Sequence, residues 1–272
     1  MKRLRTIAIF PTMFTLGNLV CGFFAIVVAA RVVAPDPEIV DPTDPTNIML
    51  SGWLIFLGMV FDALDGHVAR LSNSTTDFGA QLDSLCDVVT FGIAPSFLLV
   101  KMCPTFTYLH REAIWVIAAS FAACVALRLA RFNVETTNAA DDHLTFSGLP
   151  SPAGAAAIAG FGIMFYTLRK EGNPLIYAEQ IDTAIQMVLP FFAVLVALLM
   201  VSRVPYPHIA NQIFRGQRSF AHLVGVLFAL VAIMVIRGYS IPIICCIFVI
   251  ASPARYCWDR LVQRHHQEDP LF

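Results

Sequence analysis

Charged residues are scarce in this chain. Only 14% of its 272 residues are Asp, Glu, Lys or Arg, whereas 57% are hydrophobic, and the mean hydropathy is +0.70. A soluble domain carries roughly a quarter charged residues, so this composition excludes an ordinary water-soluble protein. The net charge is only −1, so bulk charge points to no nucleic-acid partner.

The cysteines lack the spacing of a disulfide framework or a zinc site. The seven cysteines are odd in number, include no C-x-x-C pair and fall mostly inside apolar runs. This pattern argues against a disulfide framework or a zinc site, and it indicates small buried hydrophobic side chains.

Long apolar runs occupy most of the chain. Because a helix needs about 20 apolar residues to cross the hydrocarbon, the sequence predicts an all-α, polytopic membrane helix bundle with about eight transmembrane helices. We expect residues 1–272 to form a single integral membrane domain. The predicted spans are 7–33, 48–69, 80–102, 113–130, 151–168, 183–202, 219–236 and 240–257.

Basic residues are distributed unevenly between the two sides of the membrane. With the N-terminus inside, twelve of the 18 Lys and Arg residues fall in inner segments and six in outer segments. The acidic, Pro-rich segment 34–47 contains no Lys or Arg and supports the same orientation, whereas Arg169 and Lys170 fit it poorly. We expect a bacterial cytoplasmic (inner) membrane protein whose site faces the cytosol. The outer six are Arg31, Lys101, Arg111, Arg169, Lys170 and Arg237.

Four aspartates lie at the ends of spans two and three, where apolar helices rarely carry charge. Asp62 and Asp65 are three residues apart and Asp83 and Asp87 are four apart, so each pair shares one helix face. A carboxylate at the bilayer centre costs roughly 2.5–3.5 kcal/mol, and in sequence only Arg70 is near enough to compensate. A bound cation is the simplest alternative. Carboxylates without His or Cys favour Mg²⁺ or Mn²⁺, and two such ions together suit phosphoryl chemistry.

Small residues accompany the aspartates. Gly66 follows Asp65, Ala69 extends the same face, and Gly79 lies one turn before Asp83. Glycine costs roughly 1 kcal/mol relative to Ala inside a helix, and in return it allows a ligand or another backbone to approach closely. Tight packing between membrane helices is the alternative interpretation.

The acidic and small residues of spans two and three form one pattern. It reads D-x-x-D-G-x-x-A-R, then eight residues and a G, then three residues and a D, and then three residues and a final D. The fixed positions are Asp62, Asp65, Gly66, Ala69, Arg70, Gly79, Asp83 and Asp87. This pattern resembles the signature of the CDP-alcohol phosphatidyltransferase family at all eight fixed positions, across 26 residues. The resemblance implies a six-helix catalytic core, a homodimer and two divalent cations held by the four aspartates. It also implies that Asp87 is the general base and that Gly66, Ala69, Arg70 and Gly79 contact the CDP moiety.

Further stretches resemble the phosphatidylserine synthase branch of this family. They are Phe14–Phe23, Asp83–Pro95, Arg128–Asn133, Phe146–Pro152 and Ser202-x-Val204-Pro205-Tyr206. The resemblance implies CDP-diacylglycerol and L-serine as substrates and phosphatidylserine and CMP as products. Glycerol phosphate, choline and inositol phosphate stay open as other acceptors, and a cation transporter is a rival of another class, since intramembrane carboxylates are typical of transporters too.

Three polar side chains have a candidate role beside the signature. Arg128 and Arg131 lie three residues apart on one face at the inner end of span four, and arginine suits the carboxylate of serine. Both could instead be topology anchors at the lipid headgroups. Asn18 lies well inside span one, where it faces either the nucleotide or a neighbouring helix.

The predicted orientation can be tested by thiol labelling after the native cysteines are replaced. Asp41→Cys should react with an impermeant reagent added outside intact cells, because it lies in the acidic segment without Lys or Arg. Asn138→Cys should be protected, because it follows the predicted inner end of span four. The reverse labelling pattern would overturn the orientation.

Overall fold

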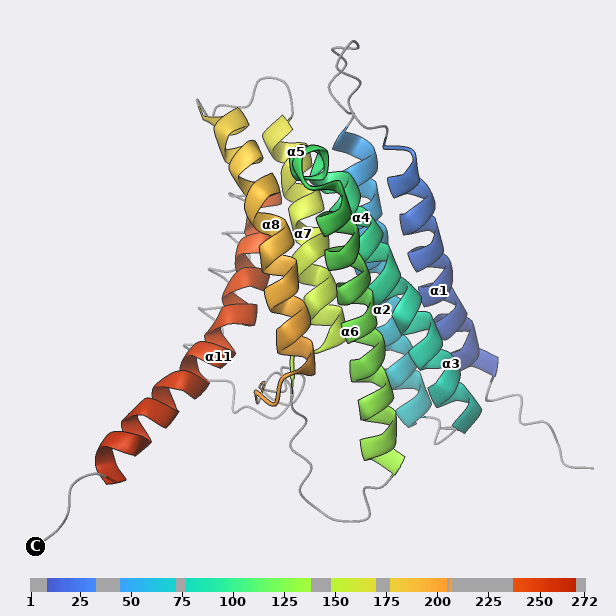
Figure 1. Ribbon diagram of the computed structural model, residues 1–272. Helices are drawn as coiled ribbons and strands as arrows, with labels where there is room; N and C mark the ends of the chain where they lie inside the picture. The colour runs from blue at the N-terminus through green and yellow to red at the C-terminus, as the bar shows by residue number, and fades with distance from the viewer. Residues whose placement is uncertain are drawn as a thin grey trace, which may run out of the picture.

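The computed structural model describes residues 9–32, 45–71, 77–137, 148–169, 177–204, 206 and 237–267. Within these ranges the regular structure is helical, without a strand, and the helices form one bundle (Figure 1). The elements are α1 Ile9–Ala30, α2 Pro45–Leu71, α3 Asp77–Asp87, the π-helical segment η2 Val88–Ile93, α4 Ala94–Met102, α5 Pro104–Leu109, α6 Arg111–Thr137, α7 Ser151–Arg169, α8 Ala178–Val201, the 3₁₀ turn η3 Arg237–Tyr239 and α11 Ser240–Gln267.

Within the described part of the chain, six stretches are long and apolar enough to cross a membrane, and they overlap the first six predicted spans. The prediction of a polytopic helical membrane protein is therefore confirmed. The seventh predicted span, 219–236, lies outside the described residues. The eighth, 240–257, falls in α11, whose apolar part Ser240–Tyr256 is shorter than the other six. The six are Thr12–Ala30, Pro45–Val68, Phe78–Met102, Arg111–Glu135, Ser151–Arg169 and Ala178–Val201.

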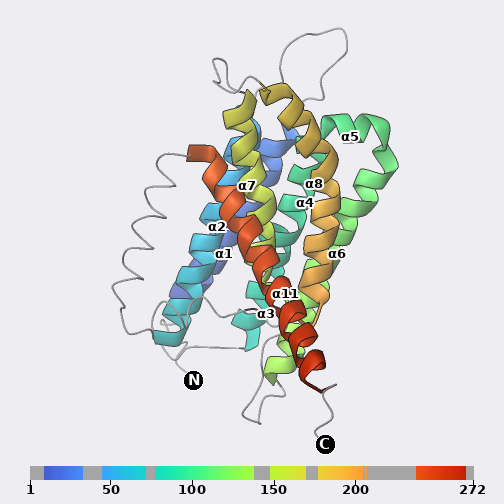
Figure 2. The same ribbon diagram turned by 90° about the vertical axis from the view of Figure 1, so that its left-hand side faces the viewer.

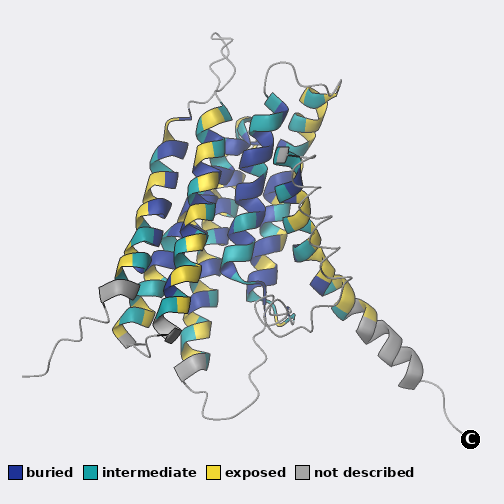
Figure 3. Ribbon diagram, turned by 180° about the vertical axis from the view of Figure 1, so that it is seen from behind, coloured by how far each residue is buried: buried dark blue, intermediate teal, exposed yellow. Residues whose placement is uncertain are grey.

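The helices pack through apolar side chains and also expose apolar side chains on the outside. Helix α1 lies against α2, α2 against α7, and α6 against α8. Phe91, Phe121 and Phe165 are fully buried between helices, whereas Phe191 is 64% exposed. Figure 3 shows exposed residues in stripes along the outer faces of the helices. Such a surface is compatible with lipid, because lipid tails are as apolar as the side chains.

The direction of the helices brings several ends together. The six spans from α1 to α8 alternate in direction, so the end of α2 and the start of α3 lie at the same end of the bundle (Figures 1 and 2). The start of α1, the ends of α6 and α8 and the start of α7 lie at that end too. The signature residues and the arginine pair therefore belong to one region, although α2 and α6 are far apart in sequence.

The third span is continuous but irregular. Its first part, α3, ends at Asp87, and the next six residues form a π-helical segment in which the Ala94 N–H donates to the Val89 carbonyl. Pro95 follows at the start of α4. Proline has no N–H and its ring crowds the carbonyl four residues earlier, and a wider π turn accommodates this. The sequence predicted one span over 80–102, and it did not predict the π turn within that span.

Thr90 of the π segment packs where α1 and α2 carry glycines. A Cβ added at Gly22 would lie 2.8 Å from the Thr90 Cα, and one added at Gly58 would lie 2.6 Å from the Thr90 Cγ2. Real Cβ atoms do not approach that closely, so both positions need glycine for this contact. The two glycines thus let the π segment sit tightly between the first two spans.

Arg169, which fitted the charge pattern poorly, has partners inside the protein. Its guanidinium donates to both carboxylate oxygens of Asp182 at 2.9 and 3.2 Å, and it also lies over the Phe165 ring. Gln186 donates to the same carboxylate at 2.6 Å and accepts the Thr105 N–H at 2.9 Å. The charge of Arg169 is therefore compensated within the bundle and is a weak indicator of membrane orientation.

The cysteines whose side chains are described are free, as the sequence predicted. Cys21, Cys86 and Cys103 are buried. Burial raises the pKa of the Cys103 thiol, which lies just beyond the third span, to about 12, so this thiol stays neutral at physiological pH.

Gly22→Ala should lower the free energy of unfolding by about 1–3 kcal/mol, because the new methyl group would clash with the backbone of Thr90. Gly17→Ala in the same helix is the matched control. Its Cβ would lie 3.2 Å from the Phe61 ring, which can shift, and alanine favours the helix by about 1 kcal/mol. Unfolding in detergent by SDS titration measures both variants, and equal stabilities would contradict the tight contact.

Candidate active site

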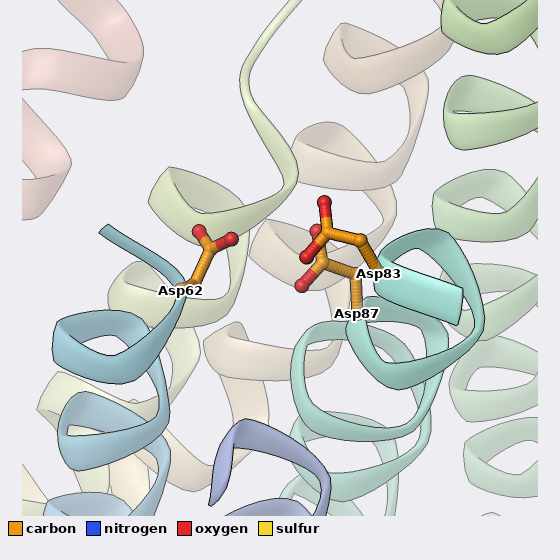
Figure 4. A group of neighbouring side chains, drawn as sticks. All are labelled: Asp62, Asp83 and Asp87. Carbon is orange, nitrogen blue, oxygen red and sulfur yellow. The ribbon is translucent and has the colours of Figure 1, made fainter. Parts of the chain in front are cut away.

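Three carboxylates converge between α2 and α3. Asp62 lies on the last turns of α2, and Asp83 and Asp87 lie one turn apart on α3. One carboxylate oxygen from each lies within 4.8 Å of the others. Figure 4 shows Asp62 pointing across from α2 toward the two side chains of α3. The convergence arises because a short connection joins two antiparallel helices that each carry acidic residues on one face.

Asp65, the fourth predicted ligand, lies beside this group. Its side chain is only 7% exposed, and its Oδ2 accepts a hydrogen bond from the Thr15 hydroxyl of α1. It is not among the three residues whose oxygens lie mutually within 4.8 Å. The four predicted ligands therefore lie in one region, with Asp65 bonded to α1.

Asp87 is the most enclosed of the converging carboxylates. It is 6% exposed, and its Oδ1 accepts a hydrogen bond of 2.9 Å from the Asn18 amide of α1. The positive charge of Arg128 on α6 also acts on it, at more than ion-pair distance. Asn18 was predicted to face either the nucleotide or a neighbouring helix, and its amide nitrogen bonds the carboxylate of a neighbouring helix.

The residues present fit a divalent cation. Among the side chains that the structure describes, no Lys or Arg forms an ion pair with Asp62, Asp83 or Asp87. Three carboxylates so close together repel one another, and their partial burial weakens the screening by water. Oxygen donors without nitrogen or sulfur suit a hard ion such as Mg²⁺ or Mn²⁺.

The other signature residues occupy the same ends of the two helices. Gly66 follows Asp65 in α2, and Gly79 lies one turn before Asp83 in α3. Ala69 and Arg70 belong to the last turn of α2, but their side chains lie outside the described set.

The two arginines of α6 have different partners. Arg128 donates from Nη1 to the Ser151 hydroxyl at 3.0 Å, and its buried Nε has no partner in the structure. Arg131 donates from Nη1 to the backbone carbonyl of Val201 at 3.0 Å. Arg128 therefore joins α6 to the start of α7, and Arg131 joins α6 to the end of α8.

The start of α7 is fixed by a short turn that docks on α8. Gly148 adopts a φ of +96° and donates its N–H to the Val204 carbonyl at 2.9 Å. Leu149 donates its N–H to the Leu199 carbonyl at 3.1 Å. A Cβ at Gly148 would lie 2.5 Å from the Met200 carbonyl oxygen, so glycine is required by both conformation and space. Ser151 is thereby held next to Arg128.

Sequence reasoning missed Thr15, Ser151 and the bond between α3 and α6. Thr15 lies three residues before Asn18, so the two polar groups share one face of an apolar span, and that spacing could have revealed it. Ser151 precedes a proline at the start of α7, a common helix-start signal. Asn133 of α6 donates to the Ser84 hydroxyl of α3 at 2.9 Å, a contact that no local sequence pattern predicts.

The fold and this acidic site define a class of protein. The sequence profile of CDP-alcohol phosphatidyltransferases matches residues 8–204, which include all six spans and the converging aspartates. The chain belongs to this family. The resemblance found in the signature is thus confirmed at the level of the family.

Relatives of the chain carry the name CDP-diacylglycerol–serine O-phosphatidyltransferase. The protein of that name from Methanocaldococcus jannaschii is 38% identical over 161 residues, which cover 59% of this chain and 65% of that protein. The Helicobacter pylori (strain J99) protein is 32% identical, covering 74% of this chain and 72% of its own length. The Bacillus subtilis (strain 168) protein is 31% identical, covering 73% and 89% respectively.

Divalent cations should stabilise the folded protein, because the acidic cluster that fits them exists only when α2 and α3 are packed. After treatment with EDTA, added Mn²⁺ or Mg²⁺ should raise the Tm, equivalent to about 2.7 kcal/mol at 100 times the Kd. Asp83→Asn should lose most of this rise.

Asp182→Asn is the matched control for that experiment, because Asp182 pairs with Arg169 at the other end of the bundle. Its Tm should fall, but the rise on adding metal should persist. A full metal-dependent rise in Asp83→Asn would remove Asp83 from the site.

Proposed function

We propose that this chain transfers the phosphatidyl group of CDP-diacylglycerol to the hydroxyl of L-serine, giving phosphatidylserine and CMP. The observation that carries the proposal is the convergence of Asp62, Asp83 and Asp87 in a member of this family. The choice of serine is supported by relatives named for that acceptor, which include proteins at 31–38% identity.

The acidic group supplies the cation site. We assign two divalent cations, Mg²⁺ or Mn²⁺, to Asp62, Asp65, Asp83 and Asp87. When bound, such cations neutralise the pyrophosphate and the charge that develops on the departing CMP. Gly66, Ala69, Arg70 and Gly79 occupy the positions of the signature that contact the CDP moiety, and they lie at the same ends of α2 and α3.

Asp87 is the base in this account. Its Oδ1 is bonded to Asn18, and we assign the other oxygen to accept the proton of the serine hydroxyl. As that O–H bond breaks, the serine oxygen forms a bond to phosphorus and the bond between phosphorus and the CMP oxygen breaks. Because Asp87 is nearly buried, little water competes with serine for the proton-accepting oxygen.

Arg128 is the residue that we assign to the serine carboxylate. Its charge already acts on Asp87, Ser151 fixes one end of its guanidinium, and its buried Nε lacks a partner. A carboxylate can take a second guanidinium donor in a charge-assisted bond. Arg131 was predicted to share this role, but its bond to the Val201 carbonyl favours an anchoring role at the end of α8.

The site opens to the cytosol in this proposal, because the acidic ends of α2 and α3 lie on the side predicted to be rich in Lys and Arg. We also assign the protein to a bacterial cytoplasmic membrane, a choice that the relatives from Helicobacter pylori and Bacillus subtilis support. Residues 1–272 would act as a single catalytic domain, and the resemblance to the family supports a homodimer.

Purified protein supplied with CDP-diacylglycerol and Mn²⁺ should release CMP when L-serine is the acceptor. Glycerol phosphate, choline and inositol phosphate should give little CMP under the same conditions, and ethanolamine, which lacks the carboxylate of serine, should be a poor substitute. Release of CMP with another of these alcohols in preference to serine would contradict the assignment of serine as the acceptor. Absence of release with every alcohol would contradict the transferase itself.

Arg128→Ala should raise the KM for serine by roughly 10- to 150-fold, the effect of losing a charge-assisted hydrogen bond, while the KM for CDP-diacylglycerol stays near the parental value. Discrimination against ethanolamine should relax in the same variant. Arg131→Ala is the comparison: it should lower the Tm and keep a serine KM close to that of the parent. A parental serine KM in Arg128→Ala would place the carboxylate elsewhere.

A further inference from the structure

Helix α1 contains no acidic residue, yet it contacts the acidic site through two side chains. Thr15 donates to Asp65, and Asn18 donates to Asp87 from the next turn. Asn18 is fully buried, and its amide nitrogen lies 2.9 Å from the Asp87 Oδ1. A neutral amide cannot exchange a proton with serine, so any effect of Asn18 through this bond is exerted on the carboxylate.

Asn18 is itself held in place by the π-helical segment. The Thr90 hydroxyl donates to the backbone carbonyl of Asn18 at 2.9 Å, and Thr90 is fully buried. A Cβ at Gly58 would lie 3.0 Å from the Asn18 Oδ1, so α2 packs closely against this amide, whose buried Oδ1 has no hydrogen-bond partner in the structure. Thr90 lies three residues after Asp87. The backbone that carries Asp87 therefore fixes Asn18, and the side chain of Asn18 fixes Asp87.

This closed arrangement limits the directions that the carboxylate can take. With one oxygen bonded to a fixed donor, rotation of the Asp87 side chain moves that oxygen away from its partner. The other oxygen then has one preferred position. A base must lie within hydrogen-bond reach of the proton that it removes, so a fixed carboxylate favours catalysis without improving substrate binding.

We propose that Asn18 is a positioning residue for Asp87 and that Thr90 supports it through the Asn18 backbone. The inference rests on the proposed function, because it assumes that Asp87 takes the proton of the acceptor. The expectation from the sequence that Asn18 contacts the nucleotide is the alternative that the experiment distinguishes.

The experiment compares Asn18→Ala, Thr90→Val and Thr90→Ser in the full-length protein. Thr90→Val removes the hydroxyl and keeps the shape, whereas Thr90→Ser keeps the hydroxyl. Ser51→Ala is the matched control, because Ser51 is also fully buried and also donates to a carbonyl of α1, that of Ala25. For each variant, kcat, both KM values, the affinity for CMP by calorimetry and the Tm are measured.

Asn18→Ala should lower kcat by about 10- to 100-fold, the cost of a hydrogen bond to a charged group, with both KM values and the CMP affinity near those of the parent. Thr90→Val should lower kcat by roughly three- to tenfold. Thr90→Ser should restore most of that loss. Ser51→Ala should lower the Tm as much as Thr90→Val and leave kcat near the parental value.

Two results would overturn the inference. A raised KM for CDP-diacylglycerol and a weakened CMP affinity in Asn18→Ala, with kcat retained, would mean that Asn18 contacts the nucleotide. A kcat in Thr90→Val no lower than in Ser51→Ala would mean that the contact serves packing alone. If Asn18→Ala does not fold, the pair Thr90→Val and Thr90→Ser decides. If the parent prefers another alcohol, the serine assignment fails and the same comparison is made with that alcohol.

Discussion

Negative charge inside an apolar bundle is the constraint on which the rest of the site depends. Asp62, Asp83 and Asp87 repel one another at their short separation, and no basic side chain among those described pairs with them directly. Such a cluster is stable only with compensating positive charge and hydrogen-bond donors. In the proposed function a divalent cation provides the charge, so the carboxylates that repel one another are also the ligands that we assign to the ion.

The surrounding helices supply the donors. Helix α1 contributes Thr15 to Asp65 and Asn18 to Asp87, and α6 contributes the charge of Arg128. Close approach of α1 to the π segment is possible because Gly22 leaves room for Thr90. The same contacts therefore hold the first three spans together and orient the carboxylates. A defect in that packing should therefore appear in catalysis as well as in stability.

The sequence predicted the features that depend on local pattern. Hydropathy over about 20 residues located the first six spans, and the three- and four-residue spacings put the aspartates on common helix faces. The π segment and the separate partners of Arg128 and Arg131 were not predictable in this way. They depend on contacts between helices, and a register change of one residue turns a helix face by about 100°. The bond from Asn18 to Asp87 depends on the same register.

Turnover should require cations held by the carboxylates of α2 and α3. The most direct measurement titrates Mn²⁺ into metal-free protein while electron paramagnetic resonance records bound Mn²⁺ and CMP release is followed in the same samples. Activity should rise in parallel with the bound fraction, and Asp62→Asn should lower both together. Full activity in protein shown to be free of metal would contradict this requirement.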